Sequence, residues 1–314
     1  MDISFLYDLH WRSRAAKALQ VANSLDVFAH LSQGAMSVEQ LAEQTETKPE
    51  MLDKLLIVCA ALGLLEKDGE AYRNSEFSQK YLVKGSELYQ GDIVGHFNSL
   101  DSVWADLGDR MLAEGAVKKE RDGNRDFIMG MHNIAVCGRT ELFLDNIDLS
   151  GRKKLFDVGG GPGSYTIAAC KRYPELQAII FDLPETIVIT KEMIAKEGMG
   201  ERISVREGSW DKDDFGEGND VVLLSEVMHG AVGNAEMKLA KAYESLVEGG
   251  LVVVQEFLLN DDKSGPLIPA VFNLMVGAYS KAELFGFVEG AGFKEVKLAA
   301  EAQEHGSTWI TGVK

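Results

Sequence analysis

Cysteine is scarce in this sequence of 314 residues, and long apolar runs are missing. The three cysteines, Cys59, Cys137 and Cys170, are odd in number and too far apart for a CxxC metal or redox motif. They fit a reducing compartment, and we expect Cys59 and Cys170 to pack in the core. No apolar run of about 18 residues occurs, and residues 1–10 lack the basic and apolar regions of a signal peptide. These absences predict a cytoplasmic protein that makes no contact with membranes.

Positive charge is also in deficit, because 32 Lys and Arg stand against 49 Asp and Glu, a formal net charge of −17. Nucleic acids and anionic membranes are bound by clustered Lys and Arg, so we expect neither as a partner. The acidity otherwise favours solubility. No zinc-type spacing of His, Cys, Asp and Glu is present, and we interpret Asp261-Asp262 as a solvated turn. The sequence therefore predicts no metal site.

Two domains are expected from the length, and 46% apolar with 26% charged residues is ordinary globular composition. In residues 1–100, Ser37 is expected to cap one helix and Pro49 to begin a second, with a β-hairpin turning at Asp68-Gly69. This order is typical of a winged helix. Nine Lys and Arg minus fourteen Asp and Glu give this segment a net charge of −5, which argues against DNA binding.

Strands and helices alternate from Lys154 onward, which predicts an α/β fold with a parallel sheet and helices on both faces. A helix is expected from Asp126 to about Asn146, and another over residues 281–290. The expected strands are residues 154–158, 178–182, 203–207, 221–226, 251–257, 294–298 and 308–313. Open sheets of this kind bind ligands beyond the carboxyl ends of their strands.

A glycine cluster follows the first of these strands, in Phe156-Asp157-Val158-Gly159-Gly160-Gly161-Pro162-Gly163, and a helix follows the cluster. Glycines allow a close approach of the backbone, and the helix offers free N–H groups. The pattern alone also fits a dinucleotide-binding loop or a plain turn. Asp182 ends the second strand, where an acid can bind ribose hydroxyls. The Gly-Lys-Ser/Thr ending of a phosphate-binding loop is absent.

Together with Phe181-Asp182-Leu183-Pro184, this stretch resembles the small-molecule O-methyltransferases that use S-adenosylmethionine and carry an N-terminal winged-helix dimerisation domain. The resemblance implies a winged-helix domain over residues 1–100, a helical linker over 101–150 that lines the substrate pocket, and a Rossmann-like methyltransferase domain over 151–314. It also implies a seven-stranded sheet with a terminal antiparallel hairpin, a homodimer, and a small aromatic or polycyclic acceptor. The expected product of the cofactor is S-adenosylhomocysteine.

The same resemblance implies which residues contact the cofactor. Many relatives have Gly-Asp after the third strand, whereas this chain has Gly208-Ser209-Trp210, so Ser209 would bond the adenine and Trp210 would stack on it. The expected cofactor-binding residues are Asp157, Gly159, Gly161, Asp182, Leu183, Ser209, Trp210 and Ser225.

By resemblance, His229 is the general base that removes a proton from the acceptor, and Glu256 orients it. A lone histidine is more often structural, but the position of His229 beyond a strand end favours catalysis. Glu256 is also interpretable as a solvated charge at a strand end. Met129, Met131 and His132 are expected in the substrate pocket, with plain core packing as the alternative for the methionines.

Two departures from the family pattern leave the acceptor atom open. Gly230-Ala231 stands where Asp-Trp often follows the histidine, and Ala278 stands near the position of a second catalytic glutamate. A hydroxyl acceptor is the first expectation. The alternatives are methylation of carbon or another atom, and a protein that binds S-adenosylmethionine without transferring methyl, as a sensor or a winged-helix regulator.

Overall fold

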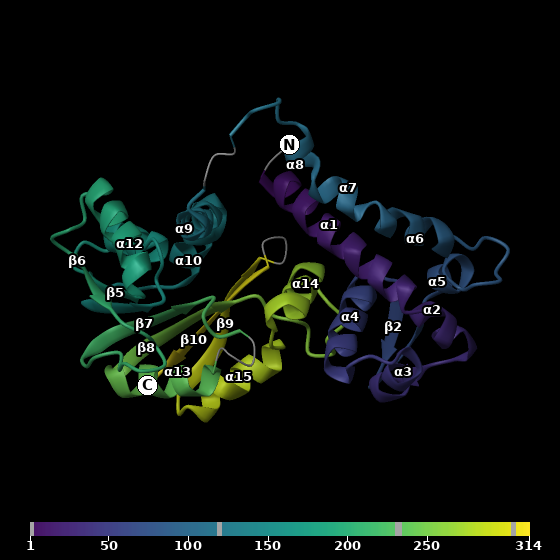
Figure 1. Cartoon of the computed structure of the whole chain (residues 1–314). Helices are drawn as coiled ribbons and strands as arrows, with labels where there is room; N and C mark the ends of the chain where they lie inside the picture. Colours follow the sequence, from purple (N-terminus) through teal and green to yellow (C-terminus); the bar gives the residue numbers. More distant parts are fainter. Residues whose placement is uncertain (1–2, 118–120, 230–233, 303–305) are drawn as a thin grey trace. The chain divides into compact units, whose positions relative to one another are not determined.

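The computed structural model describes residues 3–117, 121–229, 234–302 and 306–314, and the chain forms two compact units (Figure 1). One unit contains Met1–Glu120 and Leu259–Ser280, and the other contains Arg121–Leu258 and Lys281–Lys314. A segment of the C-terminal third therefore packs with the N-terminal unit. This division by packing does not test the functional boundaries expected at residues 100 and 150, which stay predictions.

The first unit is mainly helical and carries a small antiparallel sheet of order β1-β3-β2. Helix α14 comes from the returning segment and packs against α1 and α4. The described elements of this unit are α1 (Ile3–Ser24), α2 (Val27–His30), η1 (Leu31–Gln33), β1 (Met36–Ser37), α3 (Val38–Thr45), α4 (Pro49–Ala61), β2 (Leu65–Asp68), β3 (Ala71–Asn74), α5 (Glu76–Tyr81), α6 (Gly91–Ser99), α7 (Asp101–Ala105), α8 (Leu107–Arg110) and α14 (Leu267–Val276).

Local signals set the ends of these helices as expected. The Ser37 hydroxyl accepts a hydrogen bond from the Gln40 amide, and the Gln40 side chain accepts one from the Ser37 amide, which is a capping box. Pro49 occupies the first turn of α4, where its missing N–H costs no hydrogen bond. The hairpin of β2 and β3 turns at Gly69-Glu70, so the expected helix pair and hairpin are confirmed.

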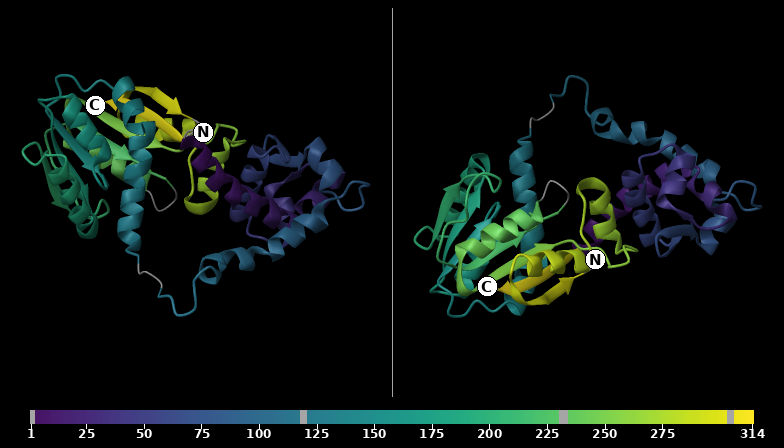
Figure 2. Two further views of the ribbon diagram at one scale, coloured as in Figure 1. Left: turned by 90° about the horizontal axis from the view of Figure 1, so that it is seen from above. Right: turned by 90° about the horizontal axis from the view of Figure 1, so that it is seen from below.

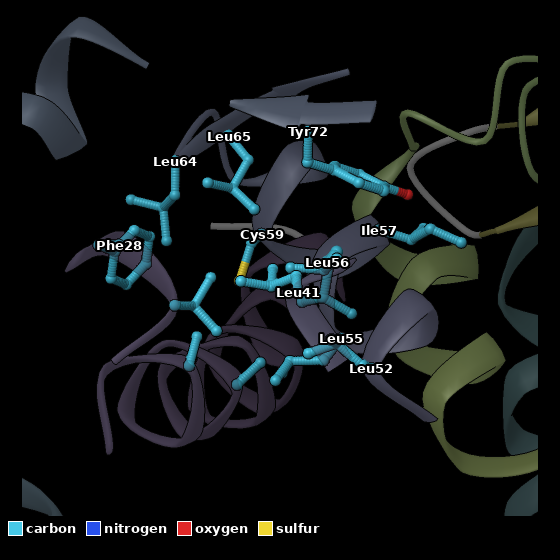
Figure 3. Close-up of a cluster of buried hydrophobic side chains, with 14 of the residues drawn as sticks. Phe28, Leu41, Leu52, Leu55, Leu56, Ile57, Cys59, Leu64, Leu65 and Tyr72 are labelled. Atoms are coloured by element: carbon cyan, nitrogen blue, oxygen red, sulfur yellow. The ribbon is translucent and has the colours of Figure 1, made fainter. Parts of the chain in front are cut away.

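The core of this unit gathers apolar side chains from both the N-terminal segment and the returning segment. Figure 3 shows part of it, with Cys59 lying among leucines of α3 and α4 and with Tyr72 above them on β3. Leu259, Ala270 and Val271 belong to the same cluster. The first unit is therefore incomplete without residues 259–280.

The second unit is a seven-stranded sheet of order β6-β5-β4-β7-β8-β10-β9, covered by helices. Its first five strands run parallel, and β10 pairs antiparallel with both β8 and β9, which confirms the expected sheet and hairpin. Its described elements are α9 (Gly123–Ile134), η2 (Ala135–Arg139), α10 (Thr140–Asn146), β4 (Lys154–Val158), α11 (Ser164–Arg172), β5 (Gln177–Asp182), α12 (Pro184–Lys196), β6 (Ile203–Glu207), β7 (Asn219–Ser225), α13 (Ala235–Ser245), β8 (Leu246–Glu256), α15 (Lys281–Gly290), β9 (Lys294–Ala302) and β10 (Ser307–Val313).

The central strands are buried on both faces because helices cover each side. Figures 1 and 2 show α9 to α12 on one face and α13 with α15 on the other. Leu155, Leu223 and Val253 pack beneath α10 to α12. Their neighbours along the strands, such as Val222 and Val254, are buried on the opposite face. The sheet thus holds its strand ends in fixed positions.

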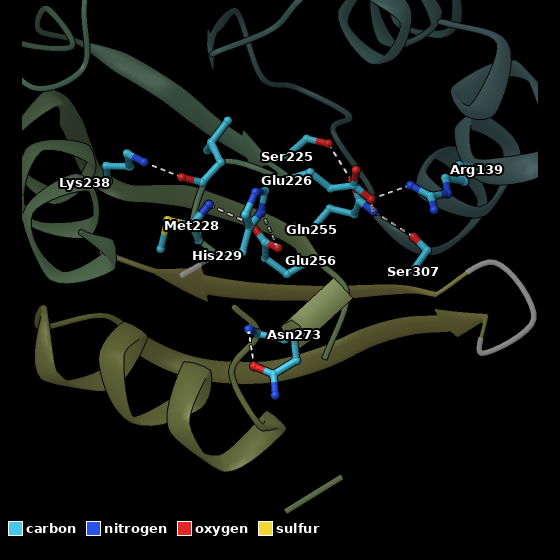
Figure 4. Close-up of polar contacts among 12 residues, drawn as sticks. Arg139, Ser225, Glu226, Met228, His229, Lys238, Gln255, Glu256, Asn273 and Ser307 are labelled. Carbon is cyan, nitrogen blue, oxygen red and sulfur yellow. Dashed lines mark hydrogen bonds and ion pairs between the residues drawn. The ribbon is translucent and has the colours of Figure 1, made fainter. Parts of the chain in front are cut away.

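One expected helix is wrong in detail. The stretch expected to run unbroken from Asp126 to about Asn146 begins at Gly123 and is interrupted at Cys137 and Gly138. Gly138 adopts a φ of 103°, a left-handed conformation that glycine reaches without steric cost. The break separates α9 from α10 and directs the Arg139 side chain toward the end of β7 (Figure 4).

Cys59 and Cys170 are buried, which confirms their expected place in the core, and no disulfide joins the three cysteines. Across the described ranges, no helix is long and apolar enough to cross a membrane. Among the same residues, no group of three or more His, Cys, Asp and Glu side chains is arranged to hold a metal ion.

Candidate active site

Neighbouring side chains and backbone pack closely against the glycine loop that follows β4. Gly159 has a φ of 63°, and its amide donates a hydrogen bond of 2.7 Å to the Phe181 carbonyl at the end of β5. A Cβ at Gly160 would lie 2.6 Å from a carboxylate oxygen of Asp157, so no larger residue fits there. Around Gly161, by contrast, the space is open within 4 Å of such an atom. The loop leads directly into α11, whose N-terminal amides favour anionic groups.

Two carboxylates lie beneath and beside this loop. Asp157 is buried, accepts a hydrogen bond of 2.6 Å from the Thr166 hydroxyl, and has its pKa raised to about 7 by burial. Asp182 accepts hydrogen bonds from the amides of Gly161, at 2.8 Å, and Leu183, at 2.7 Å. Burial raises the pKa of Asp182 despite these bonds. The two expected acids therefore meet the same loop.

Trp210, which follows β6, reaches the same loop. A Cβ at Gly159 would lie 2.9 Å from the Trp210 ring, so the indole packs directly on that glycine. The Ser209 amide donates a hydrogen bond to Asp213. Leu183 is 43% exposed beside Asp182. The structure thus brings the expected cofactor residues of β4, β5 and β6 to one edge of the sheet.

His229 and Glu256 form a pair at the ends of β7 and β8 (Figure 4). One oxygen of the buried Glu256 lies 3.3 Å from His229 Nδ1, and the other accepts a hydrogen bond of 2.7 Å from the Met228 amide. Burial lowers the pKa of His229, but the bond to Glu256 and the charges of Glu256 and Glu226 outweigh it and raise that pKa overall. Burial raises the pKa of Glu256. Glu256 is therefore no solvated surface charge.

A second polar network beside this pair was not anticipated from the sequence. Buried Arg139, at the break after α9, forms an ion pair with Glu226, and Gln255 donates a hydrogen bond of 3.1 Å to the same carboxylate. Gln255 also accepts a hydrogen bond of 2.6 Å from the expected cofactor residue Ser225. Glu226 adopts a φ of 52°, which is uncommon for a residue with a side chain. The sequence feature that could have indicated this network is Gly138, followed by Arg139, inside a stretch that otherwise has a helical pattern.

The expected pocket residues lie on α9 in different surroundings. Met129 packs against the core cluster of the second unit and is partly buried, as is Met131. His132 Nδ1 lies 2.9 Å from the Ser164 hydroxyl at the start of α11, and burial lowers the pKa of His132. Of the departures noted above, Gly230 and Ala231 lie outside the described residues. Ala278 belongs to the first unit, where its amide donates a hydrogen bond to Asn273.

Comparisons with known proteins show the family of the chain. The chain matches the O-methyltransferase domain over residues 110–294 and the O-methyltransferase dimerisation domain over residues 8–84. It is 30% identical to 3-hydroxy-5-methyl-1-naphthoate 3-O-methyltransferase of Streptomyces sahachiroi, with 99% of this chain and 95% of that protein covered. It is also 30% identical to acetylserotonin O-methyltransferase of Gallus gallus, with 90% of each covered.

A solved structure is similar over the whole chain. It is an O-methyltransferase family 2 protein from Planctomyces limnophilus in complex with apigenin, with a TM-score of 0.84, 26% identity, and coverage of 100% of this chain and 96% of that one. The matched O-methyltransferase domain spans more than half of the sequence. The two relatives named above are methyltransferases of aromatic compounds. The chain therefore belongs to the S-adenosylmethionine-dependent O-methyltransferase family, with a methyltransferase domain and an N-terminal dimerisation domain.

Proposed function

We propose that this methyltransferase acts on a hydroxyl group of an aromatic or polycyclic acceptor, with His229 as general base and Glu256 as the residue that orients it. The observation that carries the proposal is the His229–Glu256 pair at the strand ends that adjoin the glycine loop. Buried carboxylates bonded to a histidine are typical of a base whose tautomer is fixed.

The residues around the loop fit S-adenosylmethionine. Gly161 leaves open space beside the Asp182 carboxylate, and the tight approach at Gly160 brings the backbone near Asp157. In the proposed complex Asp182 and Leu183 hold the ribose side, Ser209 and Trp210 hold the adenine, and Asp157, Gly159, Gly161 and Ser225 shape the remaining wall. The cofactor supplies an electrophilic methyl group.

The base acts through one identifiable nitrogen. Because His229 Nδ1 faces Glu256, this nitrogen carries the hydrogen, and Nε2 is the atom that accepts the proton of the acceptor hydroxyl. Glu256 then stabilises the imidazolium, since it lies 3.3 Å from the other nitrogen. General base catalysis of this kind contributes about two to four orders of magnitude to the rate.

The names of the relatives support an aromatic acceptor. The compounds named for them are a hydroxynaphthoate, acetylserotonin and apigenin, which are aromatic. In our proposal Met129, Met131 and His132 on α9 contact the acceptor. The polarizable thioethers suit the faces of aromatic rings.

We also propose that the protein is a homodimer. Helix α1 leaves Phe5, Leu6 and Leu9 exposed by 49, 59 and 55%, and α6 and α7 leave Phe97 and Trp104 exposed by 54 and 68%. Apolar surface of this extent on a dimerisation domain favours association with a second copy.

Substitution of the base tests the proposal. We expect His229→Ala to bind S-adenosylhomocysteine as the wild type does and to lose about two to four orders of magnitude in turnover. Turnover is measured by mass spectrometry with 3-hydroxy-5-methyl-1-naphthoate, N-acetylserotonin and apigenin as acceptors.

The matched control is His30→Ala, which removes a histidine of the first unit. Product with wild-type yield from His229→Ala would contradict the base assignment. A methyl group found on carbon would replace the hydroxyl acceptor, and cofactor binding without product from any acceptor would favour a protein that binds S-adenosylmethionine without transferring methyl.

A further inference from the structure

Lys238 is buried in the core of the second unit, and buried lysines are rare in proteins. Only 1% of its surface is exposed, and it lies on α13 on the same face as Ala235, Leu239 and Ala242. An ammonium group loses its hydration in such a place and needs compensating contacts.

The Lys238 ammonium has two such contacts. It donates a hydrogen bond to the Val227 carbonyl, two residues before His229, and it lies 4.2 Å from the centre of the Trp210 ring. Figure 4 shows the side chain directed at the backbone that leads to Met228 and His229. A cation over an indole face is attracted by the ring, more strongly when water is excluded.

Both partners of Lys238 also pack on the same glycine. A Cβ at Gly159 would lie 2.7 Å from the Val227 side chain and 2.9 Å from the Trp210 ring. Gly159, Trp210, Lys238 and Val227 therefore form a closed ring of contacts. This ring connects the loop expected to hold the cofactor with the segment that carries His229.

We propose that Lys238 is a positioning residue for methyl transfer. Its ammonium holds the Trp210 ring against the glycine loop and keeps the Val227 carbonyl in place. One side chain thereby positions both the residues expected to bind the cofactor and the segment that carries His229. The inference rests on the proposed function of His229. Lys241, on the next turn of α13, instead donates to the backbone carbonyls of Trp210 and Asp213. The bond to Val227 distinguishes Lys238 from its neighbour.

The charges around Lys238 make its role depend on pH. Burial lowers its pKa to about 8, although the carboxylates of Asp211 and Glu256 oppose this. Its positive charge in turn lowers the pKa of His229. As the pH rises through about 8, we expect the ammonium to lose its proton and with it the attraction to the indole.

The experiment compares the wild type with Lys238→Met, Lys238→Arg and the control Lys171→Met, whose lysine forms an exposed ion pair with Glu197. Calorimetry measures S-adenosylhomocysteine affinity from pH 6.5 to 9.5. NMR of the imidazole, assigned with His229→Ala, measures the titration of His229 without cofactor.

We expect Lys238→Met to bind S-adenosylhomocysteine about 10-fold more weakly at pH 7, as loss of a buried cation–π contact predicts, and to titrate His229 at higher pH than the wild type does. We also expect the affinity of the wild type to fall above about pH 8 more steeply than that of Lys238→Arg, which keeps its charge. Lys171→Met behaves as the wild type.

Wild-type affinity and an unchanged His229 titration in Lys238→Met would overturn the proposal. Equal losses in the Met and Arg variants, with a lower unfolding midpoint in both, would also overturn it, because they indicate packing alone. Unchanged turnover of His229→Ala would instead overturn the proposed base. The S-adenosylhomocysteine affinity and the His229 titration of the Lys238 variants would still decide whether Lys238 positions these two parts of the structure.

Discussion

In the proposed mechanism, Glu256 sets the pH at which His229 is available as a base. A base acts only when neutral, and the pKa of His229 is raised above its ordinary value of about 6.5 by the bond and charge of Glu256, against burial. We therefore expect turnover to rise with pH through a value above 6.5. The Glu256 carboxylate orients the His229 imidazole, but it also keeps the imidazole protonated to higher pH, which narrows the pH range in which His229 is neutral.

Glu256→Gln tests this relation. The amide keeps the shape and removes the charge, so we expect the pKa of His229 to fall and the acid limb of kcat/KM for the acceptor to move to lower pH. Loss of orientation should lower the maximal rate by about 10-fold to 100-fold.

The control for this variant is Glu175→Gln, which removes an exposed carboxylate paired with Lys153. An acid limb that stays in place in Glu256→Gln would show that another group titrates there.

Some residues of the candidate site can be predicted from a local sequence pattern, and others cannot. Asp157, Gly159 and Asp182 lie near the ends of β4 and β5 at a recognisable spacing, so the sequence predicts where they meet. Lys238 was missed although it falls at the spacing of Ala235, Leu239 and Ala242 on one helix face, because a lysine in such a pattern is usually exposed. Its partners Val227 and Trp210 come from other parts of the chain, and only the folded sheet brings them together.

At the scale of elements, the break between α9 and α10 is the largest local difference from expectation. The sequence predicts helix over most of this stretch, but helix propensity does not place a residue with a φ of 103° inside it. The break is stabilised from outside, by the ion pair of Arg139 with Glu226 at the end of β7. Tertiary contacts of this kind override local preference.

Gly138→Ala tests whether glycine is needed at the break. An added Cβ has open space around it, so the cost is backbone strain alone, which is about 1–2 kcal/mol for a left-handed residue. We expect a lower midpoint in urea unfolding.

Gly130→Ala is the matched control, because Gly130 lies inside α9 with equally open space and without the left-handed backbone. There alanine should stabilise the protein by about 1 kcal/mol. Equal effects at the two positions would contradict the role of Gly138.

For the whole molecule, the sequence predicts both architectures, since Ser37, Pro49 and the alternation from Lys154 are local signals. It does not predict that Leu259–Ser280 joins the first unit. The segment joins the first unit because its apolar side chains cover a face of α4. This contact joins segments about 200 residues apart in the chain, so no local pattern predicts it.

The proposed homodimer is tested by Leu9→Glu. A charge in the exposed apolar face of α1 should weaken association by about 2 kcal/mol, or roughly 30-fold, if that face is buried between subunits. Light scattering over a dilution series measures the change.

Val188→Glu, on α12 of the second unit, places the same charge at a side chain that is 60% exposed and should leave the mass unchanged. A dimer of wild-type strength in Leu9→Glu would exclude this face of α1 from the interface.

The return of the chain to the first unit has a consequence for its synthesis on the ribosome. Leu259, Ala270 and Val271 complete a core that begins at Ala18, so this core cannot close until α14 has left the exit tunnel. By then β4 to β8 have already emerged and can pair. Nascent chains stalled before α14 should therefore present an open apolar face on α4 to chaperones while the parallel strands are already folding.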